Sequence, residues 1–146
     1  SQVQPQPLLQ LKHELADRIE KDQPARTRRE YVNWLSRADI SVTTAAQENF
    51  GYAVIEAMAA GAVPLLPRRL SYPEIVPKAL HEDLLYDTDR DLSDRLSAWL
   101  RQPAQVEALR VRAMRAARRH DWSLRVAALD RWIEQTVGTV RRRRKD

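Results

Sequence analysis

The segment that decides the fold lies near the middle of the chain, at residues 47–61: Gln47-Glu48-Asn49-Phe50-Gly51-Tyr52-Ala53-Val54-Ile55-Glu56-Ala57-Met58-Ala59-Ala60-Gly61. The β-branched segment before it, residues 38–44, predicts a strand. The apolar run predicts a helix from about Asn49 to Ala60, and Gly61 stands where a helix commonly ends in the left-handed conformation. A strand, a loop and a helix in this order indicate an α/β sheet, in which ligands bind at the carboxyl ends of the strands.

The rest of the chain continues this alternation. Short apolar segments at 62–66 and 84–86 predict two more strands, although Pro64 is unusual in a central strand. Helices are expected over residues 8–22, 27–37, 91–102 and 103–120 and from Asp121 onward, the second of them opened by a capping box of Thr27 and Glu30. We therefore expect an α/β fold, a Rossmann-like parallel sheet with flanking helices, and the three strands indicate the latter part of a doubly wound unit.

Composition limits the classes of protein that this chain can represent. Its 146 residues are 43% hydrophobic and 31% charged, which is typical of one globular domain. Without Cys there is no disulfide framework and no Cys-ligated metal, and the three His show no ligand spacing, so we predict neither a metal nor a resident cofactor. The longest uncharged run, residues 57–67, is too short to span a bilayer. A reducing compartment suits this composition, and we expect a cytoplasmic protein.

Charge is distributed unevenly along the chain. Residues 101–146 hold 13 Lys or Arg against 5 Asp or Glu, whereas the first hundred residues are mildly acidic. This basic end could bind a polyanion, or it could be a solvated Arg-rich helical surface that continues into the tail of residues 141–146. The four Trp are not interleaved with the basic residues as a stacking platform, and Trp99 and Trp132 are predicted to pack between helices.

The residues around the predicted helix start suggest an anion site. Free amides of the first helical turn, aided by Gly51 and the helix dipole, can bind phosphate. Glu56 is unexpected in a helix that is otherwise apolar nearly all round, because a buried carboxylate needs a partner. It lies roughly 10 Å below the helix start, so Glu48 and Glu56 would bracket the anion site. The alternative is an exposed Glu48 and a Glu56 paired with a structural Arg.

The spacing of Glu48 and Glu56, with Phe50-Gly51 between them and Ala57-Met58-Ala59-Ala60-Gly61 after, resembles the E-x7-E signature of retaining family-4 glycosyltransferases. The flanking segments 66–77 and 84–87 resemble the tRNA-queuosine α-mannosyltransferase group. The likeness covers roughly residues 31–122. It implies a partial C-terminal half of a GT-B fold, with residues 1–140 as the nucleotide-sugar-binding domain and 141–146 as a basic tail.

The resemblance also implies roles for individual residues. Glu48 would be the catalytic residue that faces the donor sugar, the amides of Asn49, Phe50 and Gly51 would bind the diphosphate, and Glu56 would bind the ribose. The donor would be a nucleotide-diphosphate sugar such as GDP-mannose, and the acceptor queuosine in tRNA. The family's N-terminal acceptor domain is missing, so we expect no activity from this chain alone, and self-association through an uncovered sheet edge.

Other functional interpretations stay open from the sequence. Family-4 relatives also act on lipids or small glycosides, and a non-catalytic basic module that binds RNA or a protein partner would share the same charge pattern. Arg68 and Arg69 follow a strand and are candidates for contact with the acceptor or the donor, or are an exposed pair on a loop. Asp87-Thr88-Asp89 matches a metal-binding D-x-D pattern, but a helix N-terminus explains these residues better.

Overall fold

The computed structural model describes residues 6–143, and this part of the chain divides into two compact units between Tyr31 and Val32. The first unit contains α1 (Gln6–Glu14) and the short 3-10 helix η1 (Ala16–Arg18). The helix that we expected over residues 8–22 is therefore shorter and starts earlier. The apolar residues of this expected helix, Leu9, Leu11, Leu15 and Ile19, are exposed.

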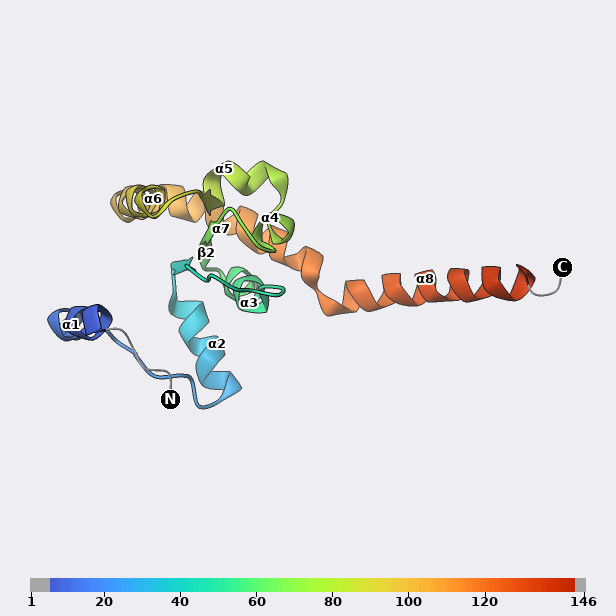
Figure 1. Ribbon diagram of the computed structural model, residues 1–146, viewed down its shortest axis with the longest axis horizontal. Helices are drawn as coiled ribbons and strands as arrows, with labels where there is room; N and C mark the ends of the chain where they lie inside the picture. Colours follow the sequence, from blue (N-terminus) through green and yellow to red (C-terminus); the bar gives the residue numbers. More distant parts are fainter. Residues whose placement is uncertain (1–5, 144–146) are drawn as a thin grey trace. The chain divides into compact units, whose positions relative to one another are not determined.

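Helices and short strands alternate in the second unit, as Figure 1 shows. Helix α2 (Arg28–Arg37) spans the boundary between the units, and the following elements are β1 (Ile40–Val42), α3 (Tyr52–Ala60), β2 (Val63–Pro67), α4 (Tyr72–Ile75), η2 (Lys78–Leu80), α5 (His81–Leu84), β3 (Leu85–Tyr86), α6 (Asp89–Arg101), α7 (Pro103–Ala117), η3 (Arg118–His120) and α8 (Trp122–Arg143). At the start of α2, the Thr27 hydroxyl accepts a hydrogen bond from the Glu30 amide at 3.1 Å, while the Glu30 carboxylate accepts the amide of Arg26. The predicted cap is present, except that the Glu30 carboxylate accepts the amide of Arg26 and not that of Thr27.

The sheet is parallel, with strand order β1-β2-β3, which confirms the α/β class predicted from the sequence. Pro64 is compatible with the central strand because successive residues of a strand direct their backbone hydrogen bonds to opposite neighbouring strands. Val63 donates to the Asp39 carbonyl and Leu65 accepts from the Thr43 amide, so both face β1. Pro64 faces the other side, where β3 begins only at Leu85, opposite Leu66. Its missing N–H therefore costs no ladder bond.

Helices α3 and α7 pack on one another and on β2, and they bury the main core. Its members come from β2, β3 and the helices around them, among them Met58, Val63, Leu65, Leu66, Leu84, Leu85, Val106, Leu109 and Ala113. Gly61 ends α3 at φ 101°, its amide donates to the Met58 carbonyl, and the Ala62 amide donates to the Ala57 carbonyl. This Schellman motif confirms the predicted C-terminus and turns the chain directly into β2.

Helix α8 differs from its predicted packing. Trp99 is buried on α6, as expected, but Trp132 is 61% exposed, together with Trp122, Leu124, Leu129 and Ile133. The prediction for Trp132 was wrong because its helical spacing indicates an apolar face without showing what covers it. The predicted tail at 141–146 begins inside α8, and residues 144–146 lie outside the described residues. No helix in the described part of the chain is long and apolar enough to cross a membrane.

Candidate functional site

Three loops meet at the carboxyl end of the sheet. Residues 43–51 follow β1, residues 68–71 follow β2, and Asp87 and Thr88 follow β3. The predicted site residues Glu48, Asn49, Phe50 and Gly51 lie in the first loop, and Arg68 and Arg69 lie in the second. The parallel topology thus brings the sequence-predicted loop residues to the edge where α/β proteins bind ligands.

Glu48 folds back on its own loop. Its Oε1 accepts the amide of Gly51 at 2.9 Å and the amide of Phe50 at 3.2 Å. The hydrogen bond from the Gly51 amide, followed by that from Phe50, lowers the pKa of Glu48 below its ordinary value. Two of the amides predicted to bind a diphosphate therefore both donate to one carboxylate oxygen of the same loop, and these hydrogen bonds favour the charged form of Glu48.

Gly51 is required by both its backbone conformation and its packing. Its φ of 81° lies in the left-handed region, and a Cβ at this position would stand 2.5 Å from Ile75 Cδ1 of α4. The glycine therefore lets the loop approach α4 closely, whereas the sequence suggested only that it lets a phosphate approach. Because Gly51 is left-handed, α3 begins at Tyr52, three residues later than expected.

The start of α3 leaves further donors available. The Gly51 carbonyl accepts the amides of Val54 and Ile55, at 3.0 and 3.2 Å. Among the described residues, no protein acceptor lies on the amides of Tyr52 and Ala53. These two amides lie next in sequence to those held by Glu48, so an anion at this point would meet consecutive N–H groups and the positive end of the helix dipole.

Glu56 lies on α3, four residues after Tyr52. It is about 6 Å further along the helix, closer than the roughly 10 Å expected from the earlier start. We expected α3 to be buried on nearly all sides. Only one face of it is buried, the face with Val54, Ala57 and Met58. Glu56 is half-buried on the more open side of the helix. The argument from a costly buried carboxylate was therefore wrong, although Glu48 and Glu56 still lie on either side of the helix start.

Arg68 and Arg69 both lie at the carboxyl end of β2, as predicted, and both have partners. Arg68 pairs with Asp87 at 3.1 Å and with Glu82 at 3.2 Å. Arg69 donates to the carbonyls of Thr44 and Ala45, at 3.5 and 3.2 Å. Arg69 thus connects the exits of β2 and β1, and its side chain is exposed beside the loop that carries Glu48.

Two tyrosines at this edge were missed from the sequence. The Tyr86 hydroxyl donates to the Thr43 carbonyl at 2.9 Å, and the Tyr72 hydroxyl lies 3.4 Å from the Thr43 hydroxyl. Burial raises the pKa of Tyr86, which keeps it a donor. The partners are 29 and 43 residues apart in the chain, and only the parallel topology places them together. They fix the point at which the chain leaves β1 and begins the Glu48 loop.

The aspartates after β3 serve the helix, as the sequence favoured. The Thr88 hydroxyl accepts the Asp91 amide at 3.1 Å and caps α6. Asp91 accepts from Arg95 Nε at 2.6 Å and from the Asp87 amide at 3.0 Å. The Arg95 hydrogen bond is the main cause of the lowered pKa of Asp91. These residues have the geometry of a helix cap.

Residues 9–120 match the model of the family described as "Glycosyl transferases group 1". The match includes the sheet, the Glu48 loop and α3, and it covers more than half of the chain. The chain belongs to this glycosyltransferase family. The predicted resemblance to a GT-B glycosyltransferase is thereby confirmed, and the three-stranded parallel sheet is consistent with a Rossmann-like part of such a fold.

Two relatives carry mannosyltransferase names. The chain is 41% identical over 76 residues to a tRNA-queuosine alpha-mannosyltransferase of Drosophila melanogaster, and this match covers 52% of the chain and 19% of the relative. It is 32% identical over 98 residues to a GDP-mannose:cellobiosyl-diphosphopolyprenol alpha-mannosyltransferase of Komagataeibacter xylinus, covering 64% of the chain and 24% of that relative. The chain thus matches about a quarter or less of the length of these relatives.

Proposed function

We propose that this chain is the nucleotide-sugar-binding part of a retaining glycosyltransferase, with GDP-mannose as donor and queuosine in tRNA as acceptor. Residues 1–140 would form the donor-binding domain. Family membership and the two mannosyltransferase relatives support the reaction class, and the name of the Komagataeibacter relative supports GDP-mannose as the donor. The name of the Drosophila relative supports the acceptor.

The observation that carries the proposal is the oxyanion position at the start of α3. The Glu48 carboxylate occupies it, on the amides of Phe50 and Gly51, with the amides of Tyr52 and Ala53 following. A donor diphosphate would replace the carboxylate on these amides. Glu48, released from its own loop, would then accept hydrogen bonds from hydroxyls of the donor sugar, while Glu56 would bind the ribose further along the helix. The amides would stabilise the negative charge that develops on the leaving diphosphate.

Replacing Glu48 separates these two roles. In Glu48→Ala the loop amides lose their internal acceptor, so we expect GDP to bind at least as tightly as it does to the wild type. The additional affinity for GDP-mannose over GDP should fall about 10- to 100-fold, because a charged hydrogen bond to the sugar is removed. Isothermal titration with both ligands measures the difference. An unchanged preference for GDP-mannose would show that Glu48 does not contact the sugar.

Replacing Glu56 tests the ribose contact. Glu56→Gln keeps the volume of the side chain, so folding should change little, while affinity for GDP should fall by about 1–3 kcal/mol through a weakened charged hydrogen bond. Guanine, which lacks the ribose, serves as the control ligand. A variant that unfolds more easily yet binds GDP normally would assign Glu56 to a structural ion pair.

A lipid-linked acceptor is the second candidate, because the Komagataeibacter relative is named for a diphosphopolyprenol substrate. Donor binding would be the same in both cases. Binding of tRNA against binding of lipid vesicles distinguishes the two candidates.

A further inference from the structure

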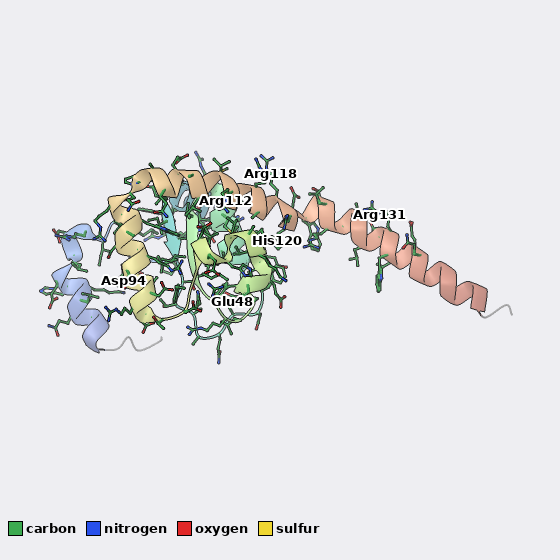
Figure 2. All side chains as sticks on the ribbon, turned by 90° about the horizontal axis from the view of Figure 1, so that it is seen from above. Glu48, Asp94, Arg112, Arg118, His120 and Arg131 are labelled. Carbon is green, nitrogen blue, oxygen red and sulfur yellow. The ribbon has the colours of Figure 1, made fainter. Side chains whose placement is uncertain are left out.

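The structure presents a surface of arginines around the junction of α7, η3 and α8. Residues 112–125 include five Arg and a single acidic residue, Asp121. Four of these arginines, Arg115, Arg118, Arg119 and Arg125, are exposed, and in the described part of the chain no carboxylate lies within ion-pair distance of them. The fifth, Arg112, pairs with Asp83 at 2.8 Å. Figure 2 shows Arg112 and Arg118 along this part of the chain and Arg131 further along α8.

The acidic residue in this segment is already engaged. Asp121 accepts hydrogen bonds from the hydroxyl and the amide of Ser123, at 2.7 and 2.9 Å, and these bonds lower its pKa. Its charge is thus held at the start of α8, and it forms no ion pair with the arginines among the described residues.

We name the four exposed arginines, Arg115, Arg118, Arg119 and Arg125, the junction arginines. Arg125 donates from Nε to the Arg119 carbonyl at 3.1 Å, which holds its side chain against η3 and leaves the charge without a carboxylate. A guanidinium group binds phosphate in bidentate geometry, so this surface has the chemistry to hold a polyanion.

The junction arginines lie next to the candidate transfer site. The His120 ring packs edge-on against Phe50 of the Glu48 loop, with ring centroids 6.4 Å apart, and His120 Nε2 lies 3.2 Å from the Ile75 carbonyl. Arg125 and Phe50 line the same hollow, about 180 Å³ in volume, at the carboxyl end of the sheet. A polyanion held by these arginines would therefore pass beside the loop that we expect to hold the donor.

The same region offers surfaces for unpaired bases. The Phe50 ring, 45% exposed, lies 4.6 Å from the ring of Tyr52, which is 66% exposed, while Trp122 is 72% exposed directly after the junction. From the sequence we predicted that the four Trp do not form a stacking platform among the basic residues; the exposure of Trp122 beside Arg119 and Arg125 leads us to propose such a role for this one residue. The hollow also contains the buried Ser71 hydroxyl, which has no hydrogen-bond partner in the described part of the chain. A buried hydroxyl of this kind is stabilised when a ligand or a water supplies the bond.

From these observations we infer that the junction arginines bind the sugar-phosphate backbone of a single-stranded RNA segment and that Phe50, Tyr52 and Trp122 stack its unpaired bases. Arginines beside exposed aromatic rings are the usual means of binding single-stranded RNA. An anionic membrane is the other polyanion to consider. On α7, Val106, Leu109, Ala113, Ala116 and Ala117 face the core, whereas Val111 and Met114 and the apolar residues Leu124, Leu129 and Ile133 of α8 are exposed. The exposed aromatic rings beside the arginines favour RNA, and the vesicle measurement below distinguishes the two. The inference rests on the proposed RNA acceptor and names the surface that would hold it.

Fluorescence anisotropy with a labelled tRNA, measured across a range of salt concentrations, tests this inference. In the double variant Arg118→Gln/Arg119→Gln, tRNA affinity should fall at least about tenfold, and the slope of log K against log salt should decrease by about 1.4, or about 0.7 for each phosphate that is no longer neutralised. Arg118→Lys/Arg119→Lys keeps the charge and should retain most of the slope. Arg101→Gln, an exposed arginine at the far end of α6, is the control and should change neither.

Three further measurements, with duplex RNA, with lipid vesicles and with GDP-mannose, distinguish the outcomes that would contradict this inference. An unchanged salt slope in the double Gln variant would overturn the inference, as would equal affinity for a duplex RNA and a single-stranded RNA of the same length. Loss of binding to phosphatidylserine vesicles without any loss of tRNA binding would assign the surface to a membrane. GDP-mannose binding is measured on the same samples. If the double Gln variant binds both GDP-mannose and tRNA as tightly as the wild type, this inference fails, whereas the proposed donor site does not.

Discussion

Gly51 sets the geometry of the candidate site, and its replacement has a defined cost. In Gly51→Ala the left-handed conformation costs about 1–2 kcal/mol. The new Cβ would stand 2.5 Å from Ile75 Cδ1. This overpacking adds about 1–3 kcal/mol. We therefore expect a loss of about 3 kcal/mol in the free energy of unfolding, measured by urea denaturation. Ile75→Val removes the clashing methyl group and should restore part of this loss.

Gly61 provides the matched control for Gly51. It is also left-handed, at φ 101°, but the nearest atom to an added Cβ is Arg110 Nη1 at 3.6 Å. Gly61→Ala should therefore cost only the conformational part, about 1–2 kcal/mol. Equal losses in the two variants, with no recovery from Ile75→Val, would mean that the loop does not pack against α4 as described.

At the residue scale, the sequence predicted positions better than partners. Glu48, Arg68 and Arg69 lie in the loops after β1 and β2, as the strand-loop-helix pattern predicted, because local patterns determine where a strand ends. Their contacts come from residues far away in the chain: Arg69 reaches carbonyls at 44 and 45, and Gly51 meets Ile75. The hydrogen bonds of Glu48 to its own loop depend on the left-handed Gly51, and a glycine alone does not reveal which conformation it takes.

Helix α6 carries a pH-dependent contribution through Asp91. The carboxylate accepts bonds from Arg95 and the Asp87 amide, and its pKa lies below the ordinary 3.8. Since the pKa is lower in the folded state, the contribution is fully present above about pH 5 and disappears as the pH falls through the lowered pKa. Asp91→Asn should lower the free energy of unfolding by about 1 kcal/mol at pH 7 and flatten its decline below pH 4.

Asp94, on the same helix, is the control for Asp91. Its carboxylate lies 3.8 Å from Arg90 Nε, and both side chains are exposed. Because exposed pairs of this kind contribute little, Asp94→Asn should leave the stability and its pH dependence unchanged within about 0.5 kcal/mol. If the two Asn variants behave alike in urea unfolding at pH 7 and pH 3.5, Asp91 does not stabilise the start of α6.

At the element scale, helix ends with strong chemical signals were predictable. Gly61 ends α3 and Pro103 begins α7 where the sequence indicated. From the sequence we predicted that α3 starts three residues too early. Gly51 is the only residue among 49–51 that disfavours a helix, and a glycine also occurs within helices. The exposure of α8 could not be predicted, because an apolar stripe indicates a buried face without identifying what buries it.

For the whole molecule, the strand order leaves β1 with a neighbour on one side only, within the described residues. Such an edge can pair with a second copy of the chain. We expect concentration-dependent self-association in sedimentation velocity, and we expect Val42→Lys to reduce it, since Val42 is 45% exposed at the end of β1. Val32 on α2 has the same exposure, so Val32→Lys is the matched control. A monomer at all concentrations would contradict this expectation.

Catalysis should require more than these 146 residues. The matches to the two mannosyltransferase relatives cover only 19% and 24% of the length of these proteins. Orienting two substrates accounts for about 7–11 kcal/mol of catalysis in favourable cases. We expect no transfer of radiolabelled mannose from GDP-mannose to queuosine-containing tRNA by this chain alone, whereas a longer protein that also has the family's N-terminal acceptor domain should transfer it. Robust turnover by the chain alone would show that it already holds an acceptor site.

The central claim is that the loop after β1 and the first turn of α3 bind the diphosphate of a nucleotide sugar. Titration of GDP-mannose into the ¹⁵N-labelled chain, followed by amide chemical shifts, tests it most directly. We predict saturable shifts for the amides of Phe50, Gly51, Tyr52 and Ala53, which also respond to GDP but not to guanosine. Shifts that leave these four amides unmoved while others saturate would contradict the account.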